Sequence, residues 1–116
     1  MKQVEMNLHT HPFERILSRH KVIEMRLYDE RRRNLSIGDE IIFTNNDDGR
    51  RIRARITGLQ PFEDFYALYA NYPKTMLGYL ENENADPSDM YQYYSKERID
   101  DYGVLAIHIE LLGDVF

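Results

Sequence analysis

A hairpin signal followed by a strictly alternating segment constrains this fold more than any other part of the sequence. Residues 45–49 read Asn-Asn-Asp-Asp-Gly, residue types that tolerate the positive φ of tight hairpin turns. The segment 51–56 then alternates, with Ile52, Ala54 and Ile56 on one face and arginines on the other. The preceding residues 40–44 are mostly apolar. The pattern predicts an antiparallel hairpin with one buried face and one charged face.

Further strands and helices are predicted on both sides of this hairpin. Strands are expected at 3–8, 21–28 and 104–112, and helices from Thr10 or His11 to about 20, around 62–69, and from Asp86 to about 101. Gly58 is expected to mark a β-bulge or a close approach of the backbone. This order predicts an α+β fold, a small curled β-barrel of about five to six strands with flanking helices. The length of 116 residues fits a single domain spanning 1–116.

Composition excludes several classes of protein. The chain has no cysteine, which excludes disulfide scaffolds, thiolate zinc sites and cysteine nucleophiles and fits a reducing cytoplasm. No apolar run approaches the roughly 18 residues of a membrane span, and the first residues lack the apolar core of a secretory signal. We therefore expect a soluble cytoplasmic protein with no membrane partner.

Charge is divided unevenly along the chain. The net charge is −5, but residues 1–55 carry 12 Lys and Arg against 9 Asp and Glu, whereas residues 56–116 carry 3 against 11. The acidic total argues against indiscriminate binding of nucleic acid. A local basic site in the first half is compatible with the acidic net charge, because an anionic ligand responds mainly to nearby charges.

Three short segments carry a resemblance to a known family. They are Lys-Val-Ile-Glu-Met-Arg at 21–26, Ser-Ile-Gly-Asp-Glu-Ile-Ile-Phe at 36–43 and Tyr-Gly-Val-Leu-Ala-Ile at 102–107. Together they resemble the ASCH domain family of the PUA-like superfamily, over residues 9 to 112. The resemblance implies a β-barrel with flanking helices and a cleft that binds RNA or a nucleotide.

One branch of that family offers an enzymatic alternative, the small bacterial N4-acetylcytidine amidohydrolases. In their K-x-x-T-x-R motif, a lysine, a threonine and a distal glutamate carry the reaction. Lys21 and Arg26 match this motif, Glu24 stands in place of the threonine, and Glu83 is the candidate for the distal acid. The resemblance thus implies Lys21, Glu24 and Glu83 as catalytic residues if the chain is a hydrolase.

Lys21, Glu24 and Arg26 are the first candidates for ligand binding. Lys21 and Arg26 are suited to a phosphate or a base edge, while Glu24 is suited to accept from a base amino group or to take a proton. The structural alternative is an ion pair between Glu24 and Arg26, two residues apart on one strand face. A carboxylate beside Lys21 favours the ammonium form and so opposes a role for this lysine as a base.

Arg51, Arg53 and Arg55 are the second candidates. Along one strand face they lie ~6.6 Å apart, a spacing that could follow a nucleic-acid backbone together with the arginines at 31–33. The alternative is a solvated strand face, or an edge protected from aggregation by its charge.

The remaining polar and aromatic side chains favour structural roles. The nine tyrosines could stack on bases, but they are better suited to a core with hydroxyls at its surface. His9, His11 and His20 would suit zinc, yet no carboxylate follows at metal-site spacing. We therefore expect no metal and no cofactor. A protein-interaction module that uses the acidic, tyrosine-rich second half is the remaining alternative, and the oligomeric state is left open.

Overall fold

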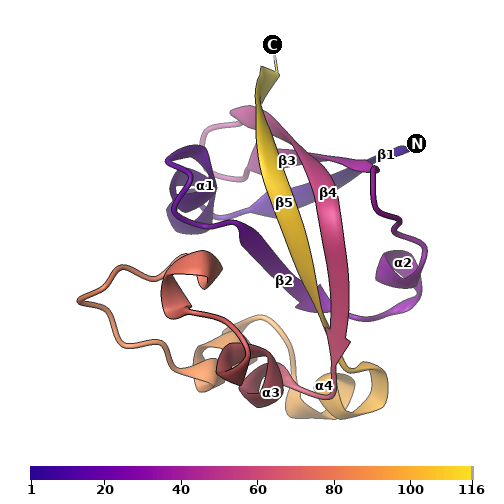
Figure 1. Cartoon of the computed structure of the whole chain (residues 1–116), viewed down its shortest axis with the longest axis vertical. Helices are drawn as coiled ribbons and strands as arrows, with labels where there is room; N and C mark the ends of the chain where they lie inside the picture. Colours follow the sequence, from indigo (N-terminus) through magenta and orange to yellow (C-terminus); the bar gives the residue numbers. More distant parts are fainter. Residues whose placement is uncertain (116) are drawn as a thin grey trace.

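The computed structural model describes residues 1–115, and its core is one five-stranded mixed sheet (Figure 1). The strands are β1 (Gln3–Leu8), β2 (Ile23–Leu27), β3 (Glu40–Asn45), β4 (Arg51–Phe62) and β5 (Val104–Val115). Their order across the sheet is β1-β3-β4-β5-β2. Among the neighbouring strands that the structure describes, only β1 and β3 run parallel, and the others are antiparallel.

Helices surround this sheet, so the expected α+β class is confirmed. They are α1 (Thr10–Leu17), α2 (Glu30–Arg33), α3 (Phe65–Ala70) and α4 (Lys96–Tyr102), with 3-10 helices η1 (Lys74–Leu77) and η2 (Pro87–Gln92). Within residues 1–115 no ladder joins the edge strands β1 and β2, so the sheet is open and the expected barrel is not confirmed. No helix in this range is long and apolar enough to cross a membrane.

The hairpin predicted from residues 45–56 forms between β3 and β4. The amide of Gly49 donates to the carbonyl of Asn45 at 2.8 Å, and β4 alternates between exposed arginines and buried apolar residues. β4 continues to Phe62, beyond the predicted end, with a register shift at Gly58 where a bulge was expected. Pro61 is tolerated because β3 pairs with β4 only as far as Arg55, so the other edge of β4 is free there.

The single helix expected from Asp86 to about 101 is wrong, because the structure divides this segment in two. Asp86 caps η2 by accepting from the amide of Ser88, as its cap role predicts. The helix then ends, and Ser95 caps α4 by accepting from the amide of Arg98. Between the two helices, Tyr94 stacks on Phe65 at 6.2 Å between ring centroids. A local cap and a tertiary aromatic contact therefore override the helical periodicity.

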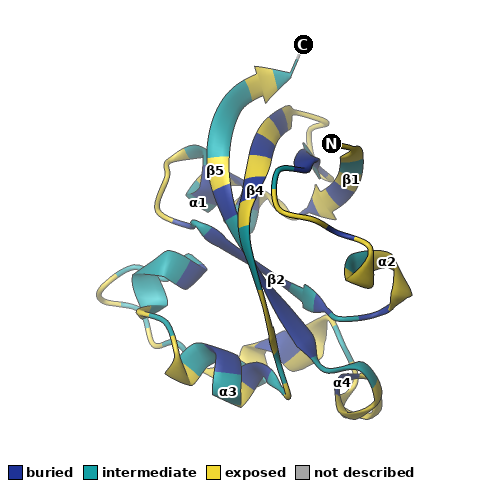
Figure 2. Cartoon of the chain, turned by 45° about the vertical axis from the view of Figure 1, so that its right-hand side comes forward, coloured by how far each residue is buried: buried dark blue, intermediate teal, exposed yellow. Residues whose placement is uncertain are grey.

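The alternation of β5 divides the interior into two hydrophobic clusters. Leu105 and Ile107 pack in a cluster with α1 and the β3–β4 hairpin, whereas Val104 and Ala106 pack in a second cluster with β2, α3 and α4. Figure 2 shows β2 buried along almost its whole length, whereas β4 alternates between buried and exposed residues. β2 lies at the sheet edge beside α1 and the segment from α3 to η2, which positions the site described next.

Candidate ligand-binding pocket

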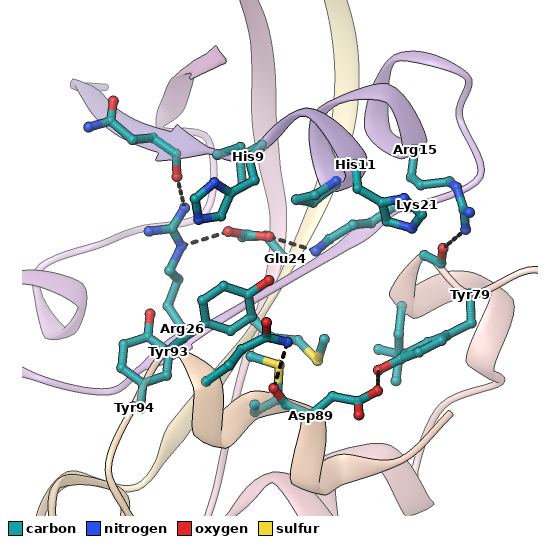
Figure 3. Close-up of a pocket in the computed structure, with 18 of the residues that line it drawn as sticks. His9, His11, Arg15, Lys21, Glu24, Arg26, Tyr79, Asp89, Tyr93 and Tyr94 are labelled. Carbon is teal, nitrogen blue, oxygen red and sulfur yellow. Dashed lines mark hydrogen bonds and ion pairs between the residues drawn. The ribbon is translucent and has the colours of Figure 1, made fainter. Parts of the chain in front are cut away.

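A pocket of about 650 Å³ opens beside β2. One wall comes from the end of β1 and from α1, and the opposite wall comes from the residues around η1 and η2 (Figure 3). The volume lies within the roughly 300–1,000 Å³ typical of small-molecule sites. The segments that form it are far apart in sequence, so only the folded chain has the pocket.

The floor of the pocket is an ion-pair cluster of Lys21, Glu24 and Arg26, here called the floor triad. Lys21 Nζ lies 2.9 Å from Glu24 Oε1, and Arg26 Nε lies 2.6 Å from Glu24 Oε2. Figure 3 shows the two cations approaching the carboxylate from opposite sides. The side chains are 9%, 3% and 13% exposed, in sequence order. The structure thus brings together the three residues that sequence reasoning singled out.

The Glu24 carboxyl is ionised at neutral pH. Burial by itself raises its pKa, but the charges of Lys21 and Arg26, together with their hydrogen bonds, outweigh burial and lower the pKa to about 2. Two buried cations therefore share one carboxylate, and the floor triad has a net charge of +1.

Backbone groups outside the triad also hold Arg26 and Lys21 in place. Arg26 Nη2 donates to the carbonyl of Asn7 at 2.9 Å, which ties β2 to the end of β1. Gly78 lies against the Lys21 side chain with a φ of 103°, and a Cβ at this position would be 3.1 Å from Lys21 Cδ. Only glycine combines this backbone conformation with such a close approach.

A second ion pair, between Arg15 and Glu83, lines the pocket beside Gly78. Arg15 Nη1 donates to Glu83 Oε1 at 2.8 Å and also to the carbonyl of Gly78. The hydrogen bond from Arg15, followed by that from the amide of Leu80, lowers the pKa of Glu83 to about 2. Glu83, suggested as a distal acid, thus lies in the same pocket as Lys21, but as an ionised partner of an arginine.

Aromatic side chains supply another part of the lining. His9 and Tyr93 stack with their ring centroids 6.2 Å apart and their planes 29° apart. Tyr69 and Tyr79 share a hydrogen bond of 2.8 Å between their hydroxyls, and Tyr79 donates to Asp89 Oδ2 at 3.1 Å. Burial raises the pKa of both tyrosines, that of Tyr69 to about 12, so both hydroxyls keep their protons. Asp89 is exposed, and its carboxylate marks the rim of the pocket.

The arginines of β4 do not line this pocket. Arg51, Arg53 and Arg55, here called the outer stripe, are between 41% and 46% exposed, and each lies near one acidic side chain. The separations are 3.1 Å from Arg51 to Glu5, 3.8 Å from Arg53 to Glu40 and 3.6 Å from Arg55 to Glu110. Of the arginines at 31–33, Arg32 reaches the pocket, where it is bound to Asp29 at 2.8 Å.

The histidines do not gather as a zinc site would require. His9 and His11 line the pocket, whereas His20 is not part of its lining. In the part of the chain that the structure describes, no group of three His, Asp or Glu side chains could hold a metal ion. His108 lies outside the pocket lining and forms a hydrogen bond with the Tyr72 hydroxyl at 2.8 Å.

Among the residues described above, sequence reasoning missed Asn7, Arg15, Gly78 and Asp89. A signal existed for Arg15, because it lies four residues after His11 and therefore on the same face of the predicted helix. Asn7 contributes a backbone carbonyl, for which side-chain type gives no signal.

Comparison with known proteins identifies the family. The ASCH domain model matches residues 6–113. None of the curated proteins matches this chain.

Two solved structures are similar along nearly their whole length. The chain is 30% identical to the hypothetical protein PH0355, covering 97% of this chain and 100% of that one with a TM-score of 0.79. It is also 30% identical to protein PF0455 from Pyrococcus furiosus, covering 97% and 98% with a TM-score of 0.69.

A more distant structure carries the family name. The chain is 16% identical to ASCH from Zymomonas mobilis, over 91% of this chain and 65% of that one, with a TM-score of 0.64. At this identity the likeness concerns the fold alone.

Proposed function

The chain belongs to the ASCH domain family, and from this premise we propose that it binds RNA or a nucleotide in the pocket above the floor triad. The observation that carries the proposal is that Lys21 and Arg26, two cations sharing one carboxylate, form the floor of a pocket large enough for a nucleotide. The absence of cysteine keeps the cytoplasm as the predicted location of this binding.

The chemistry of the lining supports a nucleotide more than a purely apolar ligand. Charged donors at the floor suit phosphate or base-edge oxygens, because charge-assisted hydrogen bonds are strong in a partly dry site. The stacked pair of His9 and Tyr93 offers an aromatic face of the kind on which unpaired bases stack. The outer stripe remains a candidate for additional contacts to the backbone of a longer RNA.

Calorimetric titrations with single-stranded RNA, tRNA and nucleotides, each at low and at high salt, test the proposal. We expect saturable binding at low salt that weakens as salt is added, in proportion to the phosphates neutralised. No measurable binding to any of these ligands at low salt would overturn it.

A hydrolase is the second candidate, because Lys21 and Glu83 line the same pocket. The reaction would add water to the acetyl carbon of N4-acetylcytidine and break its bond to N4, releasing cytidine and acetate. The pKa of about 2 for Glu24 and for Glu83 makes both carboxylates weak bases at neutral pH. The arrangement is therefore better suited to holding a ligand than to hydrolysing one.

Deacetylation followed by the absorbance of the nucleoside separates the two candidates. We expect little or no turnover by the wild type and more by Glu24→Thr, which restores the hydroxyl of the enzymatic branch. Robust wild-type turnover that Lys21→Ala abolishes would make the chain an amidohydrolase instead.

A further inference from the structure

The floor triad has more hydrogen-bond donors than the protein uses. An ammonium group has three N–H bonds and a guanidinium group has five. Lys21 donates to Glu24, while Arg26 donates to Glu24 and to the carbonyl of Asn7, with the Tyr94 hydroxyl beside it as a further acceptor. Within residues 1–115, two N–H bonds of Lys21 and at least two of Arg26 are left for a ligand.

The floor triad also carries more positive than negative charge. Glu24 is the one carboxylate that pairs with both Lys21 and Arg26 in the described chain, which leaves one positive charge in excess. The other arginines of the lining do not share this excess, since Arg15 pairs with Glu83 and Arg32 pairs with Asp29. Excess charge and unused donors in a nearly dry floor favour an anion rich in acceptors.

From these two observations we propose that the floor triad binds the terminal phosphate of a nucleoside monophosphate or of an RNA end. The inference rests on the proposed function and names the part of the ligand that enters the pocket first. A phosphate monoester brings three acceptor oxygens and a charge of about −1.5 to −2 at neutral pH. The carboxylate oxygens of Glu24 are already bound to Lys21 and Arg26. Glu24 is therefore less suited to accept a hydrogen bond from a base amino group than its residue type suggested.

The burial of the cations favours a terminal phosphate over an internal one. Lys21 and Arg26 are only 9% and 13% exposed, so the anion must descend to the floor. A terminal phosphate has one ester link that must leave the pocket, whereas an internal phosphate has two. Asp89 at the rim repels a phosphate backbone that runs across it, while the His9 and Tyr93 rings lie where the attached base can stack.

The wild-type protein is sufficient for the main test. Calorimetry compares each of the four nucleosides with its 5′-monophosphate, and one RNA octamer with a 5′-phosphate against the same octamer with a 5′-hydroxyl. We expect the phosphorylated member to bind at least tenfold more tightly in the pairs that bind, and inorganic phosphate to compete. Tight binding of the monophosphates with none by the octamer identifies a free nucleotide as the ligand, and preferential binding of the octamer identifies an RNA end.

Equal affinity within every pair would overturn the phosphate assignment and leave the proposed function standing. No binding by any nucleoside, nucleotide or RNA would overturn both. The two failures are therefore distinguishable in one set of titrations.

Two variants sharpen the test because they change the floor charge in opposite directions. Glu24→Gln raises the net charge of the triad from +1 to +2 and should tighten the binding of the preferred monophosphate severalfold. Lys21→Met leaves a neutral pair of Glu24 and Arg26 and should remove the preference for the phosphorylated ligand. Glu110→Gln and Lys96→Met are the matched controls on exposed residues, and both should bind as the wild type does.

A folded Glu24→Gln protein, verified by circular dichroism, that binds the monophosphate more weakly than the wild type would contradict the proposal. If this variant does not fold, Lys21→Met and the wild-type pairs decide the question without it.

Discussion

The floor triad and the outer stripe contain the same kinds of charge in opposite settings. In the triad, two cations share Glu24 and all three side chains are nearly buried. In the outer stripe, each arginine has its own acidic neighbour and is close to half exposed. Water and salt screen the exposed pairs of Arg51 with Glu5 and of Arg55 with Glu110. The buried charges of the triad interact through a medium of lower effective dielectric constant.

The difference shows that the number of arginines is a poor guide to a ligand site. A one-to-one surface pair has little charge left to offer a ligand and contributes little to stability. An uneven buried cluster differs in two ways, because the loss of one partner leaves a buried charge unpaired and because the cluster retains unused donors.

Removing the shared carboxylate should have the largest effect on stability. Glu24→Ala leaves Lys21 and Arg26 as two buried cations without a counter-charge, at a cost of about 3–5 kcal/mol in the free energy of unfolding. Glu110→Ala, which removes the neighbour of Arg55, should cost less than about 1 kcal/mol. Urea denaturation of both variants measures the difference, and equal losses would contradict the contrast.

Acid should remove the contribution of Glu24 in a defined pH window. Its folded-state pKa of about 2 lies below the ordinary value of 4.5 for a glutamate in an unfolded chain, so the unfolded state binds the proton first as the pH falls. The stabilisation is complete above about pH 5 and disappears as the pH falls towards 2, with a total of about 3 kcal/mol.

Urea denaturation of the wild type and of Glu24→Gln at pH 7, 5, 4 and 3 isolates this contribution from that of Glu83. The stability difference between the two proteins should shrink as the pH falls. A constant difference over this range would show that Glu24 does not titrate with a depressed pKa.

A substitution in the floor triad should reduce ligand affinity about an order of magnitude more than a substitution in the outer stripe. Lys21→Met should weaken the binding of a 5′-phosphorylated RNA at least tenfold, or about 1.4 kcal/mol, because it removes the excess charge of the floor. Arg53→Met in the outer stripe should weaken the binding of this RNA less than twofold. Its main effect should be a smaller dependence of the affinity on salt. Larger losses from Arg53→Met would place the main contact on the β4 face.

The smallest effect is expected for the coupling within one pair of the outer stripe. Arg51 and Glu5 are 41% and 72% exposed, and a double-mutant cycle to alanine should give about 0.5 kcal/mol or less. High salt should reduce even this value. A coupling above 1 kcal/mol would contradict the view that the stripe is a screened surface.

The sequence predicted those parts of the fold and site that depend on short spacings. The turn at 45–49 and the alternation after it identified the β3–β4 hairpin. The spacing of two residues placed Glu24 and Arg26 on one face of β2, and in the structure the two side chains form an ion pair. Local patterns are sufficient here because neighbouring residues alone decide the geometry.

The unpredicted parts depend on contacts between distant residues. The pairing of Arg15 with Glu83 spans 68 positions, and the match of Arg55 with Glu110 requires the register of β4 on β5. The division between η2 and α4 depends in part on a contact of this kind, the stacking of Tyr94 against Phe65. Sequence periodicity carries no information about such partners.

The position of β2 at the sheet edge has a consequence for the order of folding. Among the strands of residues 1–115 its one partner in the sheet is β5, so Ile23 pairs with His108 and Leu27 with Val104. The paired residues of β2 and β5 are far apart in the sequence, and contacts between such distant residues form slowly during folding. On the ribosome, Lys21 and Glu24 are therefore synthesised long before the strand that supports them, and the pocket cannot form on the nascent chain until β5 has emerged. Pulsed hydrogen exchange during refolding should show the amides of β2 becoming protected together with those of β5, and not with those of the earlier β3–β4 hairpin.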